Sequence, residues 1–581
     1  MFYQRHTYKG QNLSRWSIPN YWDVIAIVFV VTILGLLTYA TGAMFGTYEL
    51  GQSMPISLDY DQLPYYSLRS VVRMFIAMIF ALICTFIFGT LAATNKHAER
   101  LILSLVDILQ SVPVLGFLSI TVVGFIHFFH GSYWGPESAA IFAIFVAQVW
   151  NMILSFYQSL ITIPSELDEA TRVFKLNAWQ RFWRLKVPYS MPGLVWNTMM
   201  SMSASWVFLV ECEAFSVGDH SVTLPGLGSY IALAIQQADT SAIFAVIITM
   251  FFVILIYDQI FFRPLVAWSE KFKMEHTSPD VMANSWVLNL FQRTVFFQRI
   301  GGAISWFSEF WVNGLSWTSR TKVKVSDKFQ RGFVKASRGV YYSLLWIAII
   351  ASVFFTVSYF YGAVTWGELG HVFYLGFLTA TRVMALIVLS TLIWVPIGVW
   401  IGLSPKASKM IQPLAQFFAA FPVNLLYPLA AVLILTYKLN INIWCAPLMI
   451  LGAQWYILFN VIAGVNAIPK HLHQATATLQ VRGWLWWKRL ILPSVFPYYI
   501  TGALTAAGGA WNISIIAEFI TWGDHKLIAS GLGSYITQTY DDNDFMRLVL
   551  GVIVMSFYVL LFNRILWRPL YRLAEQRFGF N

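Results

Sequence analysis

Long apolar runs recur along the chain and are separated by short polar segments. A helix of about 20 apolar residues crosses the ~30 Å hydrocarbon core of a bilayer, whereas the strands of a membrane barrel would alternate over about ten residues. The runs therefore predict an all-α polytopic membrane protein with twelve spans. We place these spans near residues 22–43, 69–93, 101–128, 138–163, 193–215, 242–262, 342–362, 378–403, 411–437, 442–467, 498–520 and 547–563.

The composition supports the same class. Only 11% of the 581 residues are charged and 58% are hydrophobic, whereas a soluble protein carries about 25% charged residues. Soluble catalysis, nucleic-acid binding and a secreted disulfide scaffold are therefore excluded. The three cysteines lie in separate apolar runs, and His127 and His130 have no third ligand nearby, so we expect neither disulfides nor a metal site.

The charges of alternate loops predict the orientation. Lys/Arg residues near 96–100, 406–409 and 564–577 fall on one side of the predicted spans, which the positive-inside rule makes cytoplasmic. Both termini are then cytoplasmic. The connection 263–340 carries twelve Lys/Arg against five Asp/Glu, so we expect a linker whose amphipathic stretches lie on the anionic inner leaflet. A regulatory docking site is the alternative.

The second half of the chain repeats the first. The segment 226–231 returns unchanged at 531–536, and one register of 305 residues covers more than a hundred positions. Arg73 and Arg382 match at a spacing of 309, as do Gly89 and Gly398, and Pro113 and Pro422. Six spans per half make the copies parallel repeats, which place a translocation path at their interface. We predict a first repeat at 1–265, a linker at 266–340 and a second repeat at 341–581.

The loops after the fourth and tenth spans share one further pattern, at residues 164–188 and 469–493. Its residues are Glu169, Ala170, Thr171, Lys175 and Pro188 in the first loop, and Gln474, Ala475, Thr476, Gln480 and Pro493 in the second. They resemble the EAA loop of ATP-binding-cassette importer permeases, in which Glu-Ala-Ala is followed by a glycine and then by an aliphatic-x-aliphatic-Pro ending. The resemblance implies a coupling helix that docks on an ATPase subunit.

Both loops depart from the family pattern. Lys175 and Gln480 stand where glycine is usual. We expect a neighbour such as Asn177 or Gly483 to supply any positive-φ turn, and the proline to end the element before the next span. Because Gln474 replaces the usual glutamate, the two docking sites are expected to differ in charge.

Six further segments carry a more specific resemblance: Ser67–Arg69, Gln110–Pro113, Phe418–Pro422, Pro497–Gly502, Ala517–Glu518 and Gly531–Gly533. They resemble the nitrate/sulfonate/taurine type of these permeases. The resemblance implies a type I importer fold with two permease copies fused, in the inner membrane of bacteria, moving a small organic or inorganic anion. It also implies two copies of an ATPase subunit and an extracytoplasmic substrate-binding protein.

The chain itself is expected to be no enzyme. It contains no Gly-Lys dipeptide and so no phosphate-binding loop. ATP and Mg²⁺ are expected on the separate ATPase, with no catalytic residue, cofactor or metal in this chain.

Polar residues within the apolar spans are candidates for the translocation path, because ionisable groups are costly in lipid. Glu213 and Glu518 form a symmetric pair that either gates the outer mouth or caps the helices opened by Gly-Leu-Gly. Glu211 and Glu213 point about 200° apart on a helix and cannot serve one face. The full set is Glu211, Glu213, Asn512 and Glu518, with Asp107, Gln110 and Asn197 as weaker candidates.

Three other functions fit the sequence less well. A secondary transporter with parallel repeats would need no coupling loops. A fused permease for ferric ion or thiamine fits the outer Ala-Glu and Gly-Leu-Gly loop less well. A membrane scaffold that transports nothing would not need paired loops. The importer permease is therefore the favoured hypothesis.

Overall fold

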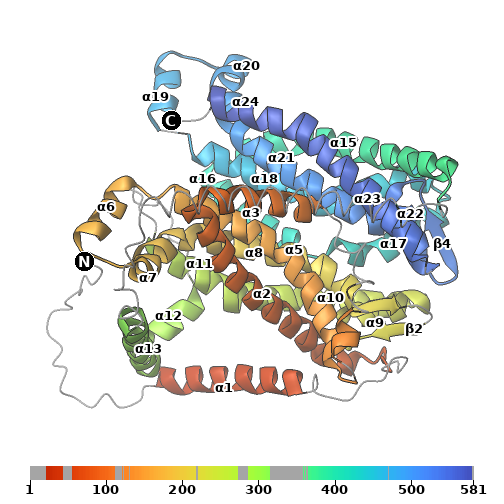
Figure 1. Ribbon diagram of the computed structural model, residues 1–581, viewed down its shortest axis with the longest axis horizontal. Helices are drawn as coiled ribbons and strands as arrows, with labels where there is room; N and C mark the ends of the chain where they lie inside the picture. Colours follow the sequence, from red (N-terminus) through yellow and green to blue (C-terminus); the bar gives the residue numbers. More distant parts are fainter. Residues whose placement is uncertain are drawn as a thin grey trace. The chain divides into compact units, whose positions relative to one another are not determined.

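The computed structural model is almost entirely helical (Figure 1). It describes residues 21–42, 55–111, 121, 124–129, 131–217, 220–272, 285–314, 358, 360, 364–468, 470–542 and 544–578. Within these residues, eight helices are long and apolar enough to span a membrane, or nine if one bent pair counts as a single span. The chain is thus an all-α multi-pass membrane protein. The predicted span 342–362 and the centre of span 101–128 lie largely outside the described residues, so the count of twelve stays a prediction.

Most predicted spans correspond to helices of the structure. In the first half these are α1 (Tyr21–Gly42), α2 (Leu63–Thr94), α3 (Lys96–Ser111), α5 (Trp134–Ile161), α8 (Val187–Glu213) and α10 (Thr240–Tyr257). In the second half they are α15 (Trp366–Leu403), α16 (Pro405–Ala420), α17 (Tyr427–Thr436), α18 (Ile441–Asn466), α21 (Leu492–Ala517) and α23 (Phe545–Phe562).

One predicted span is wrong as a single helix. The segment 411–437 is broken into α16 and α17, which bend by 77° around Pro422. Phe421, the residue before the proline, is extended with φ −73° and ψ 125°, because the proline ring disfavours a helical conformation at the preceding position. The break brings Asn424 to the start of α17, where it meets the first half of the chain.

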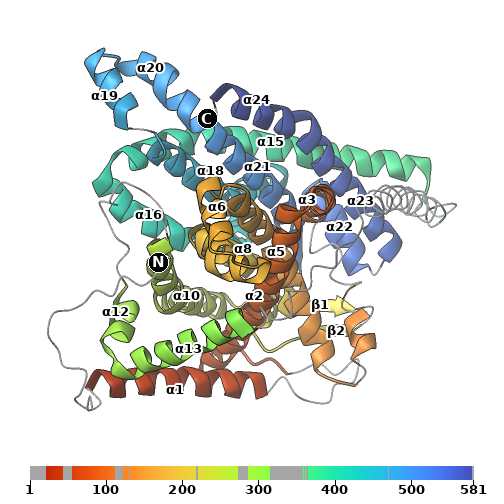
Figure 2. The same ribbon diagram turned by 60° about the vertical axis from the view of Figure 1, so that its left-hand side comes forward.

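The described chain forms two compact units. The larger comprises 40–162, 193–256 and 323–581, and the smaller comprises 1–39, 163–192 and 257–322. In the larger unit α2 packs along α5, and α18 packs against both α15 and α21 (Figures 1 and 2). In the smaller unit lie α6 (Ser165–Val173), α7 (Ala178–Arg181), α11 (Arg263–Ser269), α12 (Trp286–Arg293) and α13 (Val295–Gly314).

The internal repeat is visible in the helix crossings. A Cβ at Gly89 of α2 would lie 2.7 Å from the ring of Phe156 on α5, and a Cβ at Gly398 of α15 would lie 2.8 Å from Val461 on α18. These are equivalent positions of the two repeats. Glycine permits the close approach that stabilises helix pairs in membranes, so the same crossing is built twice.

Two short hairpins accompany the helices, a feature that the sequence did not predict. Strands β1 (Ala214–Val217) and β2 (His220–Thr223) pair antiparallel, as do β3 (Phe519–Trp522) and β4 (His525–Ile528). Each hairpin directly follows a long helix, α8 or α21, and leads to a short helix, α9 (Leu227–Gln236) or α22 (Leu532–Asp541). Gly523 turns the second hairpin at φ +55°. The hairpins place the Gly-Leu-Gly segments back over the ends of the long helices.

Candidate functional site

A cluster of four buried charges lies in the first half, where α2 meets the start of α5 and the end of α8. Arg73 Nε lies 2.6 Å from Glu137 Oε2, and Arg73 Nη1 lies 2.6 Å from Glu213 Oε1. Arg69 pairs with Glu137 as well. All four side chains are at most 1% exposed. The two arginines and two glutamates balance in charge, as buried ions must.

The second half contains a reduced version of this cluster. Arg382 Nη1 lies 2.7 Å from Glu518 Oε1, the equivalent of the Arg73–Glu213 pair. At the position that corresponds to Glu137 stands Asn442, whose backbone oxygen accepts a hydrogen bond from Arg382 Nε at 3.2 Å. At the position that corresponds to Arg69 stands Leu378. Compared with the first half, the second half therefore lacks one positive charge and one negative charge, so its smaller cluster is also neutral.

The buried glutamates hold the Gly-Leu-Gly segments. Glu213 Oε2 accepts a hydrogen bond from Gly228 N at 2.6 Å, and Glu518 Oε2 accepts one from Gly533 N at 2.8 Å. A Cβ on the first glycine of either segment would overlap the glutamate carboxylate. Glycine is therefore required here by the close approach of backbone to carboxylate.

Glu213 and Glu518 thus bond to the starts of α9 and α22 and have no exposed surface. Neither side chain lines a cavity described below, and their gating role stays a prediction. The arginine partners were not among the predicted site residues. A signal was present, because Arg73 and Arg382 recur at the repeat spacing inside apolar runs, where a lone charge is costly.

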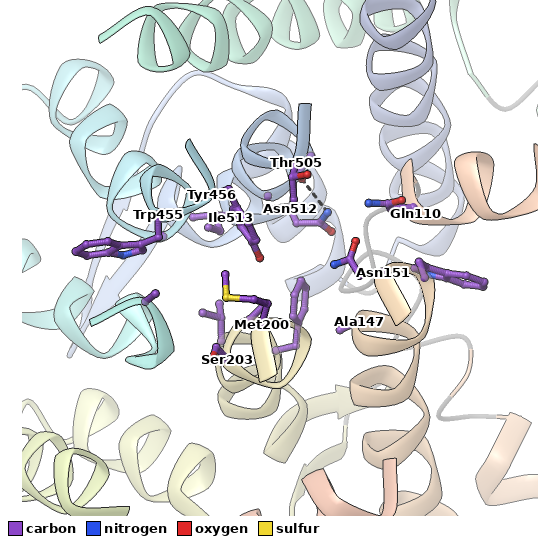
Figure 3. A pocket seen from close by; sticks show the side chains of 18 of the residues that line it. Gln110, Ala147, Asn151, Met200, Ser203, Trp455, Tyr456, Thr505, Asn512 and Ile513 are labelled. Carbon is purple, nitrogen blue, oxygen red and sulfur yellow. Dashed lines mark hydrogen bonds between the residues drawn. The ribbon is translucent and has the colours of Figure 1, made fainter. Parts of the chain in front are cut away.

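A cavity of about 120 Å³ lies among helices of both halves in the larger unit (Figure 3). It is lined from α3, α5, α8, the end of α16, α18 and α21. Two of the predicted path residues, Gln110 and Asn512, contribute to its wall. Asn197 does not, because its amide donates to Ser155 Oγ at 2.9 Å and joins α8 to α5. The side chain of Asp107 lies outside the described part of the structure.

Glu211 lines a second cavity, of about 290 Å³, together with Asn424 and Tyr427. Asn424 Nδ2 lies 3.0 Å from Glu211 Oε1 and 3.2 Å from the backbone oxygen of Val207. This contact joins the two halves, since Glu211 belongs to the first and Asn424 to the second. Glu211 and Glu213 face different neighbours, as their spacing on a helix requires.

The two predicted coupling loops share one backbone geometry. A short helix, α6 or α19 (Lys470–Thr478), is followed by a turn, a second short helix, α7 or α20 (Gly483–Trp486), and a π-helical turn. Leu176 N donates to Thr171 O at 3.1 Å, and Val481 N donates to Thr476 O at 2.9 Å. These bonds close the C-terminus of each first helix in a Schellman-type turn. Glu169 and Gln474 are both exposed on these helices.

The structure corrects two expectations about these loops. Lys175 and Gln480 themselves adopt the left-handed conformation, each at φ 52°, and Asn177 is extended. The Schellman-type closure requires a positive φ at this position whatever the residue. In the second loop Gly483 does have the expected positive φ, at +63°, in addition to Gln480. Pro188 and Pro493 also do not end an element. Each is the second residue of a long helix, α8 or α21, which continues without a break from the preceding π-helical turn, within Ala178–Glu213 or Gly483–Ala517.

Replacing Lys175 or Gln480 with glycine should therefore raise the stability of the protein by about 1 kcal/mol per site, because non-glycine residues pay roughly that amount in the left-handed region. The midpoint of thermal unfolding in detergent measures the effect. Gly483→Ala is the matched control, since Gly483 has φ +63° with no neighbour within 4 Å, and it should lower the midpoint. A lower midpoint for both glycine variants would contradict the prediction.

The first coupling loop contacts the linker within the smaller unit. Asn313 Oδ1 on α13 accepts hydrogen bonds from Arg184 at 3.0 Å and Gln180 at 3.4 Å. The rings of Trp179 and Trp311 lie 6.5 Å apart. Helix α13 also exposes Trp306 and its neighbours Phe307 and Phe310, an arrangement typical of helices at a membrane surface. The placement of the linker on the inner leaflet stays a prediction.

A comparison with protein families identifies this architecture. The family described as "Binding-protein-dependent transport system inner membrane component" matches residues 85–262 and again 394–578. Together the two matches cover more than half of the chain. The chain belongs to this family. The repeat seen in the sequence is thus two copies of one family domain, and the chain is similar to ABC importer permeases of the nitrate type.

Individual relatives agree with this assignment. The chain is 29% identical over 185 residues to the bicarbonate transport system permease protein CmpB of Synechococcus elongatus. The matched region covers 32% of this chain and 63% of that protein. The chain is 25% identical over 179 residues to the nitrate import permease protein NrtB of Leptolyngbya laminosa, covering 31% and 59%. A probable ABC transporter permease protein of Brucella melitensis is 25% identical over 202 residues, covering 34% and 77%. The chain thus spans about 60% of the length of the first two relatives.

Proposed function

We propose that this chain is the membrane-spanning subunit of an ATP-driven importer and moves a small organic or inorganic anion by alternating access. The observation that carries the proposal is the duplicated coupling segment. Two loops with different sequences adopt the same helix, left-handed turn, helix and π-turn, and each leads directly into a long apolar helix. A movement imposed on either loop is therefore transmitted along α8 or α21, both of which line the first cavity.

Two coupling segments call for two copies of an ATPase subunit, which bind ATP and Mg²⁺. The family description also implies an extracytoplasmic substrate-binding protein. In this proposal the chain lies in the bacterial inner membrane, with both termini and the segment 266–340 in the cytoplasm. The repeats then extend over 1–265 and 341–581. Glu169 and Gln474 would make unequal contacts with the two ATPases, since only Glu169 offers a charge-assisted hydrogen bond.

The substrate class rests on the relatives. CmpB and NrtB carry the names of bicarbonate and nitrate permeases, and both solutes are small anions with one charge. A secondary transporter is disfavoured, because it needs no paired coupling loops. The matched relatives also favour this substrate class over ferric ion or thiamine.

The chain purified alone should bind no ATP, and the chain purified with its ATPase should retain two ATPase copies. Calorimetric titration with ATP and native mass spectrometry of the complex measure these outcomes. Glu169→Arg combined with Gln474→Arg should reduce ATPase retention at least tenfold, because both changes put charge and bulk on exposed docking surfaces. Lys406→Glu, in another predicted cytoplasmic loop, is the control and should retain it. Saturable ATP binding by the isolated chain, or full retention by the double variant, would refute the proposal.

A further inference from the structure

The first cavity is built from equivalent positions of the two repeats. Eighteen of its twenty-one lining residues form nine pairs that are separated by 305 or 309 residues. Trp150 and Trp455 are such a pair, as are Phe208 and Ile513. A cavity whose wall comes from matching positions of both copies lies on the pseudo-twofold axis that relates them. This is where parallel repeats place a translocation path.

The polar groups of this wall are not duplicated. Gln110 in the first half corresponds to Ala419 in the second, and Asn151 corresponds to Tyr456. Asn512 in the second half corresponds to Val207 in the first. Figure 3 shows the amide groups of Gln110, Asn151 and Asn512 turned toward the same space. Two identical permease chains would present each amide twice, so the fused chain has acquired an asymmetric wall.

Two side-chain amides of the wall, those of Gln110 and Asn151, are available to a ligand. The structure shows no hydrogen bond from the amides of Gln110 or Asn151 to another described residue, and both side chains are only half-buried where they line the cavity. The described lining contains no Lys, Arg, Asp or Glu. The wall therefore offers neutral N–H donors without a full charge.

These properties restrict the ligand. A dianion buried without a cation would pay a large desolvation cost, whereas neutral N–H donors can solvate a single delocalised charge. The volume, about 120 Å³, is somewhat smaller than the ~150 Å³ cavities that hold one benzene molecule. The fit is best for a solute of about four to six non-hydrogen atoms.

Resting on the proposed transport function, we propose that this cavity is the membrane substrate site, and that Gln110 and Asn151 select there for a small solute with one negative charge. The first half supplies these donors, and the second half supplies Asn512 and the ring of Tyr456. The two halves therefore contribute unequally to recognition, although they contribute equally to the shape of the path.

The test uses the full complex of this chain, its ATPase and its binding protein in proteoliposomes, with nitrate, bicarbonate and sulfate as probes. Asn151→Asp, which keeps the shape of the side chain and adds a negative charge, should lower the uptake of the transported monoanion at least tenfold. Gln110→Ala, which copies Ala419 of the second half, should lower uptake about fivefold. Native mass spectrometry of both variants shows whether they retain two ATPase copies, so that a loss of uptake is separated from a loss of assembly.

Asn460→Asp is the matched control. It makes the same change on α18, where the side chain donates to Tyr456 O and does not line the cavity, and uptake should stay within twofold. Normal uptake by Gln110→Ala and by an assembled Asn151→Asp would overturn the site. If the complex that carries Asn151→Asp fails to assemble, uptake by Gln110→Ala alone decides whether the cavity is the substrate site. Transport of sulfate by the wild-type complex, or of neither monoanion, would overturn the ligand class. The proposed function fails separately, if the wild-type chain does not retain or stimulate its ATPase.

Discussion

Replacing Arg69 with leucine and Glu137 with asparagine in one variant should cost far less stability than either replacement alone. Each single change leaves one buried charge of the cluster without its balance, and breaking a buried ion pair in this way costs about 3–5 kcal/mol. The double variant reproduces the pair Leu378 and Asn442 that the second half already contains. We expect it to cost about 1 kcal/mol, with the remaining Arg73–Glu213 pair intact.

A double-mutant cycle on the midpoint of thermal unfolding in detergent measures the coupling between the two positions. Arg382→Leu leaves Glu518 buried without a cation. Its unfolding midpoint is the reference for a cluster that has lost its charge balance. If the losses of stability in the two single variants simply add in the double variant, the prediction is wrong, because Arg69 and Glu137 then do not compensate each other's charge. A double variant as damaged as Arg382→Leu would contradict it as well.

Gly228→Ala and Gly533→Ala should each destabilise the protein by roughly 3 kcal/mol, the upper part of the usual range for overpacking. A methyl group at Gly228 would overlap the backbone oxygen of Val210, and one at Gly533 would overlap that of Ser514. Backbone cannot rotate away as a side chain can, so α9 or α22 must shift. The shift would also lengthen the hydrogen bond from the glycine N–H to Glu213 or Glu518.

Thermal unfolding measures this loss. Gly370→Ala is the matched control, because Gly370 lies within α15 and a Cβ there would meet nothing within 4 Å. That change should raise stability by up to about 1 kcal/mol, the helix propensity gained. Alanine variants at Gly228 and Gly533 that unfold at the wild-type temperature would show that the loop helices do not depend on this close approach.

Much of the candidate site could be predicted from the sequence, because its signals are local or periodic. The coupling loops are short segments whose pattern occurs twice, and Gln110 and Asn512 are polar residues inside apolar runs. The left-handed residues are predicted only in part. Local chemistry favours Asn177 or Gly483, and Gly483 does have a positive φ, but the closure of the preceding helix places Lys175 and Gln480 in the left-handed conformation as well.

The sequence by itself determined the class of the protein, its duplication and the repeated loop pattern that predicts the coupling segments. These follow from the length of apolar runs, from identity at a fixed spacing and from a motif within one loop, none of which requires knowledge of distant contacts. The tertiary structure decided which buried charges pair and which polar residues share a space. Arg73 and Glu213 are 140 residues apart, and several equally polar partners were available to each, so only the packing of helices could select among them.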